Sequence, residues 1–139
     1  MAQVTITKLV EGSNSVIIKV DLLNNDNTVE LENKVFFSPS DVSPALPNNK
    51  PAFRIMQAWY DSSSFDITIK SNAVTPFTYW TFAKTTTNHI DFRSFGGVTD
   101  PNTHANPPNT APGALTISTK GFGPEGSAGS FILELKKLA

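Results

Sequence analysis

Alternation of hydrophobic and polar residues limits the possible folds of this chain more than any other feature of its sequence. In the clearest segment, Val16, Ile18, Val20 and Leu22 occupy alternate positions. Successive side chains of a β-strand point to opposite faces, so these four would share one buried face. A turn-like run, Asn-Asn-Asp-Asn at 24–27, follows. Alternation then resumes at Val29, Leu31, Val35 and Phe37. The two segments are therefore predicted to form a β-hairpin.

Further segments show strand-like patterns, and together they predict an all-β protein. Alternation recurs over residues 4–6, 65–70, 115–118 and 131–136. Residues 53–60 and 77–82 instead carry apolar side chains at both odd and even positions, so that both faces of such a strand would be apolar. No segment shows the 3.6-residue spacing of an amphipathic helix. With about eight strands in 139 residues, we expect one domain over 1–139, an antiparallel β-sandwich of the jelly-roll or Ig-like kind.

Two long proline-rich segments interrupt the strand pattern. Residues 38–51 contain four prolines, and residues 98–113 contain four more among Asn and Thr. Proline has no backbone N–H to donate, so neither segment can lie inside a sheet. Loops of this length in a compact domain are usually functional or disordered. Both segments are therefore candidates for contact with a partner.

The segment 90–97, Ile-Asp-Phe-Arg-Ser-Phe-Gly-Gly, predicts a structural corner. The residues that we assign to it are Asp91, Phe92, Arg93, Phe95, Gly96 and Gly97. The two phenylalanines favour burial, and the charged pair needs water or a partner. The two glycines allow the backbone to adopt positive φ at little steric cost.

Composition argues against several functional classes. The formal net charge is −1, and the largest basic cluster is Lys136–Lys137, so a nucleic-acid partner is not expected. The chain has no cysteine, which excludes disulfides and thiolate metal sites. No apolar run approaches the roughly 20 residues that span a bilayer, and residues 1–4 have no signal-peptide character. We expect a protein made in a cytoplasm, without a membrane partner.

Residues suited to catalysis or metal binding are few. His89 and Asp91 would share one face of a strand and could bind a metal together, but no third ligand is evident. His104 lies in a proline-rich segment. The serine run at 62–64 lacks a nucleophile elbow, and the glycine-rich run at 121–126 precedes a strand rather than a helix. We expect no enzymatic activity and no cofactor.

Two aromatic pairs, Trp59–Tyr60 and Tyr79–Trp80, are open to two interpretations. They could pack in the core, or they could form a platform for a sugar or a protein partner. Adjacent residues on a strand point to opposite faces, so one member of each pair is expected near a surface, a second layer or an interface.

Several of these segments resemble small virion proteins of tailed bacteriophages, a family of structural and capsid decoration or cement proteins. The resemblance rests on the Asp-Phe-Arg-x-Phe-Gly-Gly sequence at 91–97, with more generic matches at 7–20, 115–121 and 131–137. It implies membership in a particle rather than a catalytic activity.

As a member of such a family, the chain would bind and stabilise the shell formed by the major capsid protein, at the virion surface. Homo-oligomers, with trimers favoured, would match capsid geometry. The N-terminal strand and the proline-rich segments would make the contacts. The candidate contact residues are Val4, Ile6, Val42, Leu46, Pro47, Pro101, His104, Pro107 and Pro108. The alternative is a tail- or fibre-associated module that binds a host receptor or glycan.

Overall fold

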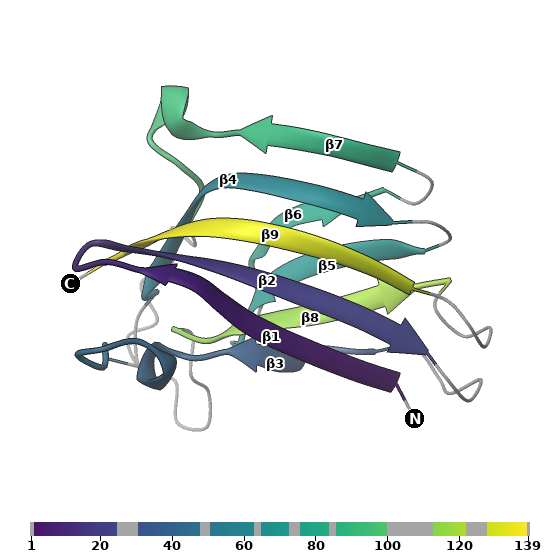
Figure 1. The fold of residues 1–139 in the computed structure, drawn as a ribbon, viewed down its shortest axis with the longest axis horizontal. Helices are drawn as coiled ribbons and strands as arrows, with labels where there is room; N and C mark the ends of the chain where they lie inside the picture. Colours follow the sequence, from purple (N-terminus) through teal and green to yellow (C-terminus); the bar gives the residue numbers. More distant parts are fainter. Residues whose placement is uncertain are drawn as a thin grey trace.

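The computed structural model describes residues 2–24, 31–47, 51–62, 65–72, 76–83, 86–99, 113–121 and 128–138. Two antiparallel sheets pack face to face (Figure 1), which confirms the predicted β-sandwich. The five-stranded sheet contains, in spatial order, β1 (Ala2–Glu11), β2 (Ser15–Asn24), β9 (Ala128–Lys137), β4 (Phe53–Ser62) and β7 (Thr86–Asp91). The four-stranded sheet contains β3 (Lys34–Phe37), β8 (Leu115–Lys120), β5 (Asp66–Ser71) and β6 (Thr78–Phe82).

Strands β2 to β9 follow the jelly-roll topology, one of the two sandwich types expected from the sequence. β2 pairs with β9, β3 with β8, β4 with β7 and β5 with β6, as in one long hairpin folded over on itself. Additional pairing of β4 with β9 and of β5 with β8 completes the two sheets. β1 lies outside this roll and pairs with β2.

The hairpin predicted over residues 16–37 is wrong. β2 is paired with β1 on one side and with β9 on the other, so neither of its edges is available to β3. β3 begins only at Lys34 and pairs with β8 in the opposite sheet. The chain therefore passes from one sheet to the other between the end of β2 and the start of β3. Residues 25–30, which include most of the predicted turn, lie outside the described residues.

The inward residues predicted for β3 are also partly wrong. Val35 is 41% exposed, whereas Phe36 and Phe37 are both buried. The pairing of β3 with β8 shifts register between Val35 and Phe37. A bulge of this kind places two successive side chains on the same side of the strand, which strict alternation cannot predict.

Nine strands are present in the described part of the chain, where about eight were expected. The additional strand is β7, whose sequence Thr-Thr-Asn-His-Ile-Asp is mostly polar. β7 is the edge strand of its sheet. A strand at this position needs less hydrophobic surface than an interior strand, which is why no hydrophobic alternation marks it.

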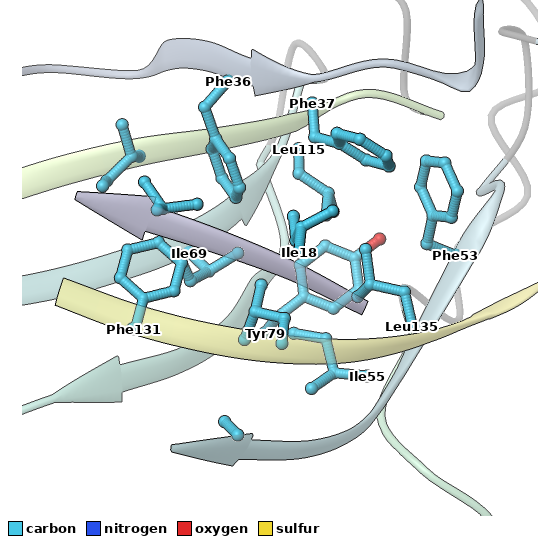
Figure 2. Close-up of a cluster of buried hydrophobic side chains, with 14 of the residues drawn as sticks. Ile18, Phe36, Phe37, Phe53, Ile55, Ile69, Tyr79, Leu115, Phe131 and Leu135 are labelled. Atoms are coloured by element: carbon cyan, nitrogen blue, oxygen red, sulfur yellow. The ribbon is translucent and has the colours of Figure 1, made fainter. Parts of the chain in front are cut away.

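The core lies between the two sheets and is formed by alternate residues of the strands (Figure 2). Predicted inward residues that are at most 2% exposed are Val16, Ile18, Val20, Leu22, Phe37, Phe65, Ile67, Ile69, Leu115, Ile117, Phe131, Leu133 and Leu135. Phe131 joins the two layers, because its ring lies 5.8 Å from that of Phe36 and 5.5 Å from that of Phe82. Alternation thus predicted the side chains that fill the sandwich.

Candidate functional site

The predicted corner follows β7 and is held in place by backbone hydrogen bonds. The Phe92 N–H donates to the Met56 carbonyl (2.8 Å), and the Gly97 N–H donates to the Phe92 carbonyl (2.9 Å). A single-turn 3₁₀ helix, η2 (Arg93–Phe95), lies between these two bonds. Beyond it, Val98 and Ile55 exchange two hydrogen bonds of 2.8 and 2.9 Å. The corner is therefore attached to β4 at both of its ends.

Both glycines of the corner have positive φ, +83° at Gly96 and +91° at Gly97. A Cβ atom on Gly97 would lie 2.6 Å from Arg54 Cγ and 2.6 Å from Met56 Sδ, whereas one on Gly96 would have no neighbour nearer than 4.0 Å. Gly96 is thus required for its backbone conformation alone. Gly97 is required both for its conformation and for the close approach of β4.

Asp91 and Arg93 form a bidentate ion pair on the surface of the corner. Arg93 Nε donates to both Asp91 oxygens (2.9 and 3.1 Å), Nη2 donates to Oδ2 (2.7 Å), and the Arg93 backbone N–H donates to Oδ1 (2.9 Å). The hydrogen bonds from the Arg93 side chain, followed by that from its backbone, lower the pKa of Asp91 to about 2. The same pairing raises the pKa of Arg93. Because both side chains remain well exposed, the pair mainly fixes local geometry.

Three aromatic rings meet at this corner with different exposures. Phe92 is 3% exposed, and Trp80 of β6 packs against it edge to face, with ring centroids 5.0 Å apart. This contact connects the edge strand of one sheet with the segment that follows the edge strand of the other. Phe95 is 74% exposed, so the prediction that both phenylalanines are buried is correct for Phe92 and wrong for Phe95.

We call Trp80 together with residues 91–97 the aromatic corner. This corner presents exposed aromatic rings and the Arg93 guanidinium on a fixed backbone. Phe95 and Trp80 are the exposed aromatics, at 74% and 38%, and Arg93 lies between the two phenylalanines in sequence. Aromatic residues and arginine are enriched at the energetic centres of protein interfaces. A backbone that is already fixed loses little conformational entropy on binding. The arrangement is therefore suited to binding a protein surface.

The predicted partner contacts that the structure describes belong to β1 and to the first proline-rich segment, and they differ in exposure. Ile6 is 38% exposed on β1, Val4 is partly buried, Val42 is 4% exposed, Leu46 packs against the core and Pro47 is exposed. Val42 is thus a core residue and is not available for contact. Pro101, His104, Pro107 and Pro108 lie outside the described residues.

A polar cluster around Glu11 holds the first proline-rich segment against β1 and β9. The Glu11 carboxylate accepts hydrogen bonds from Lys8 Nζ (2.9 Å), Lys137 Nζ (3.0 Å) and the Ser43 N–H (2.7 Å). Lys137 also donates to the Gly12 carbonyl (2.8 Å), and its side chain is only 5% exposed. The bond from Lys8, followed by those from Ser43 and Lys137, lowers the pKa of Glu11 to about 2. The segment around Ser43 is therefore anchored to the sandwich.

The four aromatics considered as one platform are separated by the fold. Tyr60 points inward, and its ring stacks on that of the buried Phe82 at 4.6 Å. Tyr79 is 3% exposed in the core. Trp80 belongs to the aromatic corner, so only Trp59 remains on the outer face of the five-stranded sheet.

A second surface feature surrounds Trp59 on this outer face. Trp59 pairs with His89 of β7 and with Ile132 of β9, and the rings of Trp59 and His89 stack at 4.8 Å and 7°. Together with Asp61 and Ser130, these residues line a pocket of about 340 Å³. The pocket offers an aromatic wall beside a carboxylate and a hydroxyl group.

Gln57 connects His89 to Glu134 on the same face. Gln57 Nε2 donates to Glu134 Oε1 (2.7 Å), and Gln57 Oε1 lies 2.9 Å from His89 Nε2. Because an amide oxygen can only accept, the proton in this bond belongs to His89 Nε2. His89 thus takes part in a hydrogen-bond network. Among the residues that the structure describes, no three His, Cys, Asp or Glu side chains gather as a metal site.

Scans of the chain against protein-family models and against curated proteins give no match. Within the described ranges, no helix is long and apolar enough to cross a membrane. The proximity of Trp80 to residues 91–97 could not be predicted from residue patterns, because their contact depends on how the two sheets meet at this edge. The aromatic corner and the Trp59 pocket are the two candidate sites.

Proposed function

We propose that the protein is a non-enzymatic structural component of a phage virion, a decoration or cement protein that binds the shell of the major capsid protein through its aromatic corner. The observation that carries this proposal is the 74% exposure of Phe95. Two positive-φ glycines, an ion pair and a buried phenylalanine fix the backbone on which this ring is displayed. The same segment carries the resemblance to phage virion proteins.

Attachment of this kind stabilises a shell by mass action. A protein that binds the assembled lattice and not its separated subunits shifts the equilibrium toward the assembled state. Oligomers that contact several lattice positions at once gain further from multivalency. The jelly-roll fold is found in viral capsid domains and in lectins, so the fold alone does not decide between a structural and a sugar-binding function.

The proposal is tested with phage heads that lack this protein. Purified wild-type chain is mixed with such heads, and bound chain is measured by co-sedimentation together with the temperature at which the shells open. Phe95→Ala should weaken binding about tenfold or more, as expected for a central aromatic contact. Val35→Ala is the matched control, because Val35 is 41% exposed on β3, at the opposite edge of the four-stranded sheet from β6.

Two results would contradict this proposal. One is wild-type chain that does not sediment with the heads. The other is Phe95→Ala binding as tightly as the wild type, which would place the contact elsewhere on the molecule.

The Trp59 pocket supports a second candidate function, a receptor- or glycan-binding module of a tail or fibre. Its stacked Trp59–His89 pair lies beside Asp61 and Ser130, and aromatic surface next to polar groups suits a sugar ring. Binding on a glycan array that is lost in Trp59→Ala and retained in Phe95→Ala would favour this function. An array without signal, together with head binding, would favour the capsid function.

A further inference from the structure

Within the described ranges the two sheets have four edge strands, and three of them are protected against pairing with another chain. β3 and β6 contain only four and five residues, and each has a register shift. β7 has six residues and ends at the Asp91–Arg93 ion pair. Short length, bulges and charged groups are the usual means by which proteins protect sheet edges.

β1 lacks these protections over its first six residues. The strand is ten residues long, contains no proline, and shifts register only between Lys8 and Val10. All residues of the segment 2–7 are uncharged. In the described part of the chain, β2 is the one strand that pairs with β1, and β1 runs along one side of the sandwich (Figure 1). Its outer edge therefore presents backbone N–H and C=O groups that no strand of the described residues pairs with.

We propose that this edge pairs over residues 4–8 with β1 of a second copy of the chain, antiparallel about a twofold axis, with Ile6 opposite Ile6 and short of the register shift between Lys8 and Val10. A twofold interface uses the same patch on both copies, so one unprotected edge is enough to form it. In this register Thr5 lies opposite Thr7 of the other copy, a favourable cross-strand pair. This proposal does not depend on the proposed function.

The charges of β1 are compatible with this pairing. Lys8 would lie opposite Val4 of the second copy, so no charge meets a like charge. The Lys8 ammonium group already donates to Glu11 (2.9 Å) and to the Asp41 carbonyl (3.0 Å) within its own chain. The second copy therefore does not bring an unpaired charge into the interface.

A pocket beside the outer edge of β1 supports placing Ile6 at the centre of the proposed interface. The pocket lies between β1 and β3, has a volume of about 410 Å³, and is lined by Ile6, Lys8, Phe36, Phe37 and Asp41. Ile6 pairs with the buried Val20, which places it on the inner side of its sheet. It nevertheless remains 38% exposed. Twofold pairing brings the second Ile6 alongside it, and each isoleucine covers the other.

The pairing would leave the aromatic corner uncovered. β1 and β7 are the opposite edge strands of the five-stranded sheet. Joining two copies through β1 makes one continuous sheet with β7 and its corner at both ends. Such a dimer presents two copies of Phe95 at widely separated positions.

The test uses sedimentation velocity on the purified wild-type chain and on two variants. The wild type should sediment as a dimer. Ile6→Lys should sediment as a monomer, because it places two like charges opposite each other. Leu23→Lys is the matched control and should remain dimeric, since Leu23 has a similar exposure of 40% but lies on β2. Circular dichroism and thermal melting establish that both variants are folded.

Because the chain contains no cysteine, single cysteines give a second measurement. Directly opposite residues of antiparallel strands have Cα atoms about 4.5–5.5 Å apart, within the range that a disulfide spans. Oxidation of Ile6→Cys should therefore yield a covalent dimer, whereas Leu23→Cys should not. This result decides the question even if Ile6→Lys fails to fold.

Three outcomes would overturn the pairing. The first is a wild-type chain that remains monomeric at its highest soluble concentration, and the second is a trimer of the kind expected from capsid geometry. The third is a dimer that persists in Ile6→Lys and forms no disulfide in Ile6→Cys. None of these outcomes affects the head-binding measurement with Phe95→Ala.

Discussion

Phe92 and Phe95 lie 6.4 Å apart between ring centroids, yet the first is 3% exposed and the second 74% exposed. Because the single turn of η2 lies between them, the two side chains point in different directions. Phe92 packs beneath Trp80, whereas Phe95 projects into solvent. Two residues of one type, three positions apart, thus have different roles in the molecule.

We expect Phe92→Ala and Phe95→Ala to affect stability very differently. Loss of the buried Phe92 ring should lower the free energy of unfolding by about 3 kcal/mol or more. Loss of the exposed Phe95 ring should change it by about 0.5 kcal/mol or less. Urea denaturation of the two variants measures both values. An equal loss of unfolding free energy in both variants would show that Phe95 contributes to folding rather than to contact with a partner.

The two glycines of the corner should also differ when each is replaced by alanine. Gly96→Ala requires a left-handed backbone at an alanine, which costs about 1–2 kcal/mol. Gly97→Ala adds a collision with Arg54 and Met56, for a total of about 2–4 kcal/mol. Gly12→Ala is the control, because a Cβ there would make only an ordinary contact of 3.7 Å with the Ser15 carbonyl oxygen. Equal losses at Gly96 and Gly97 would mean that the β4 side chains move aside freely.

The cluster around Glu11 should make stability depend on pH under acidic conditions. The pKa of Glu11 falls from 4.5 to about 2 on folding, so the unfolded chain takes up its proton first as the pH is lowered. The stabilisation is complete above pH 4.5 and is lost as the pH falls toward 2. Melting temperatures measured across this window should fall more steeply for the wild type than for Glu11→Gln.

Asp91 titrates over a similar window, because its pKa is also lowered to about 2. Glu11→Gln should therefore retain the part of the pH dependence of the melting temperature that comes from Asp91. Asp91→Asn serves as a second variant that removes this part. Identical slopes for the wild type and Glu11→Gln would show that the cluster does not couple Glu11 to folding.

The network around Gln57 predicts the tautomer of His89. Because Gln57 Nε2 donates to Glu134 and Gln57 Oε1 accepts from His89, the neutral imidazole should carry its proton on Nε2. Nitrogen-15 NMR of the imidazole at neutral pH measures this directly. Gln57→Met should weaken the preference, because it removes the acceptor of the Nε2 proton. A neutral ring protonated on Nδ1 would mean that the Gln57 amide has the opposite orientation.

The filling of the core could be predicted from the sequence because the direction of a side chain on a strand is a local property. Val16, Ile18 and Leu22 face inward as their spacing requires, and so do Phe131 and Leu133. Local spacing fails where a bulge intervenes, as at Phe36. It also fails for a polar edge strand such as β7.

Strand pairing could not be predicted in the same way, because it is set by contacts between distant parts of the chain. The asparagine-rich run at 24–27 favoured a hairpin, but β2 pairs with residues 2–11 and 128–136 instead. At the candidate site, the positive φ of Gly96 and Gly97 followed from residue type. The outward direction of Phe95 did not, because it depends on the turn of η2 and on the attachment of the corner to β4.

The position of β9 has a consequence for how the protein is made. β9 lies between β2 and β4 and pairs with both, yet it follows every other strand in the sequence. During synthesis, β2 and β4 emerge from the ribosome before β9, so they cannot form their native pairing until β9 has been made. We therefore expect the nascent polypeptide to acquire its native fold late, and to need protection from premature association until then.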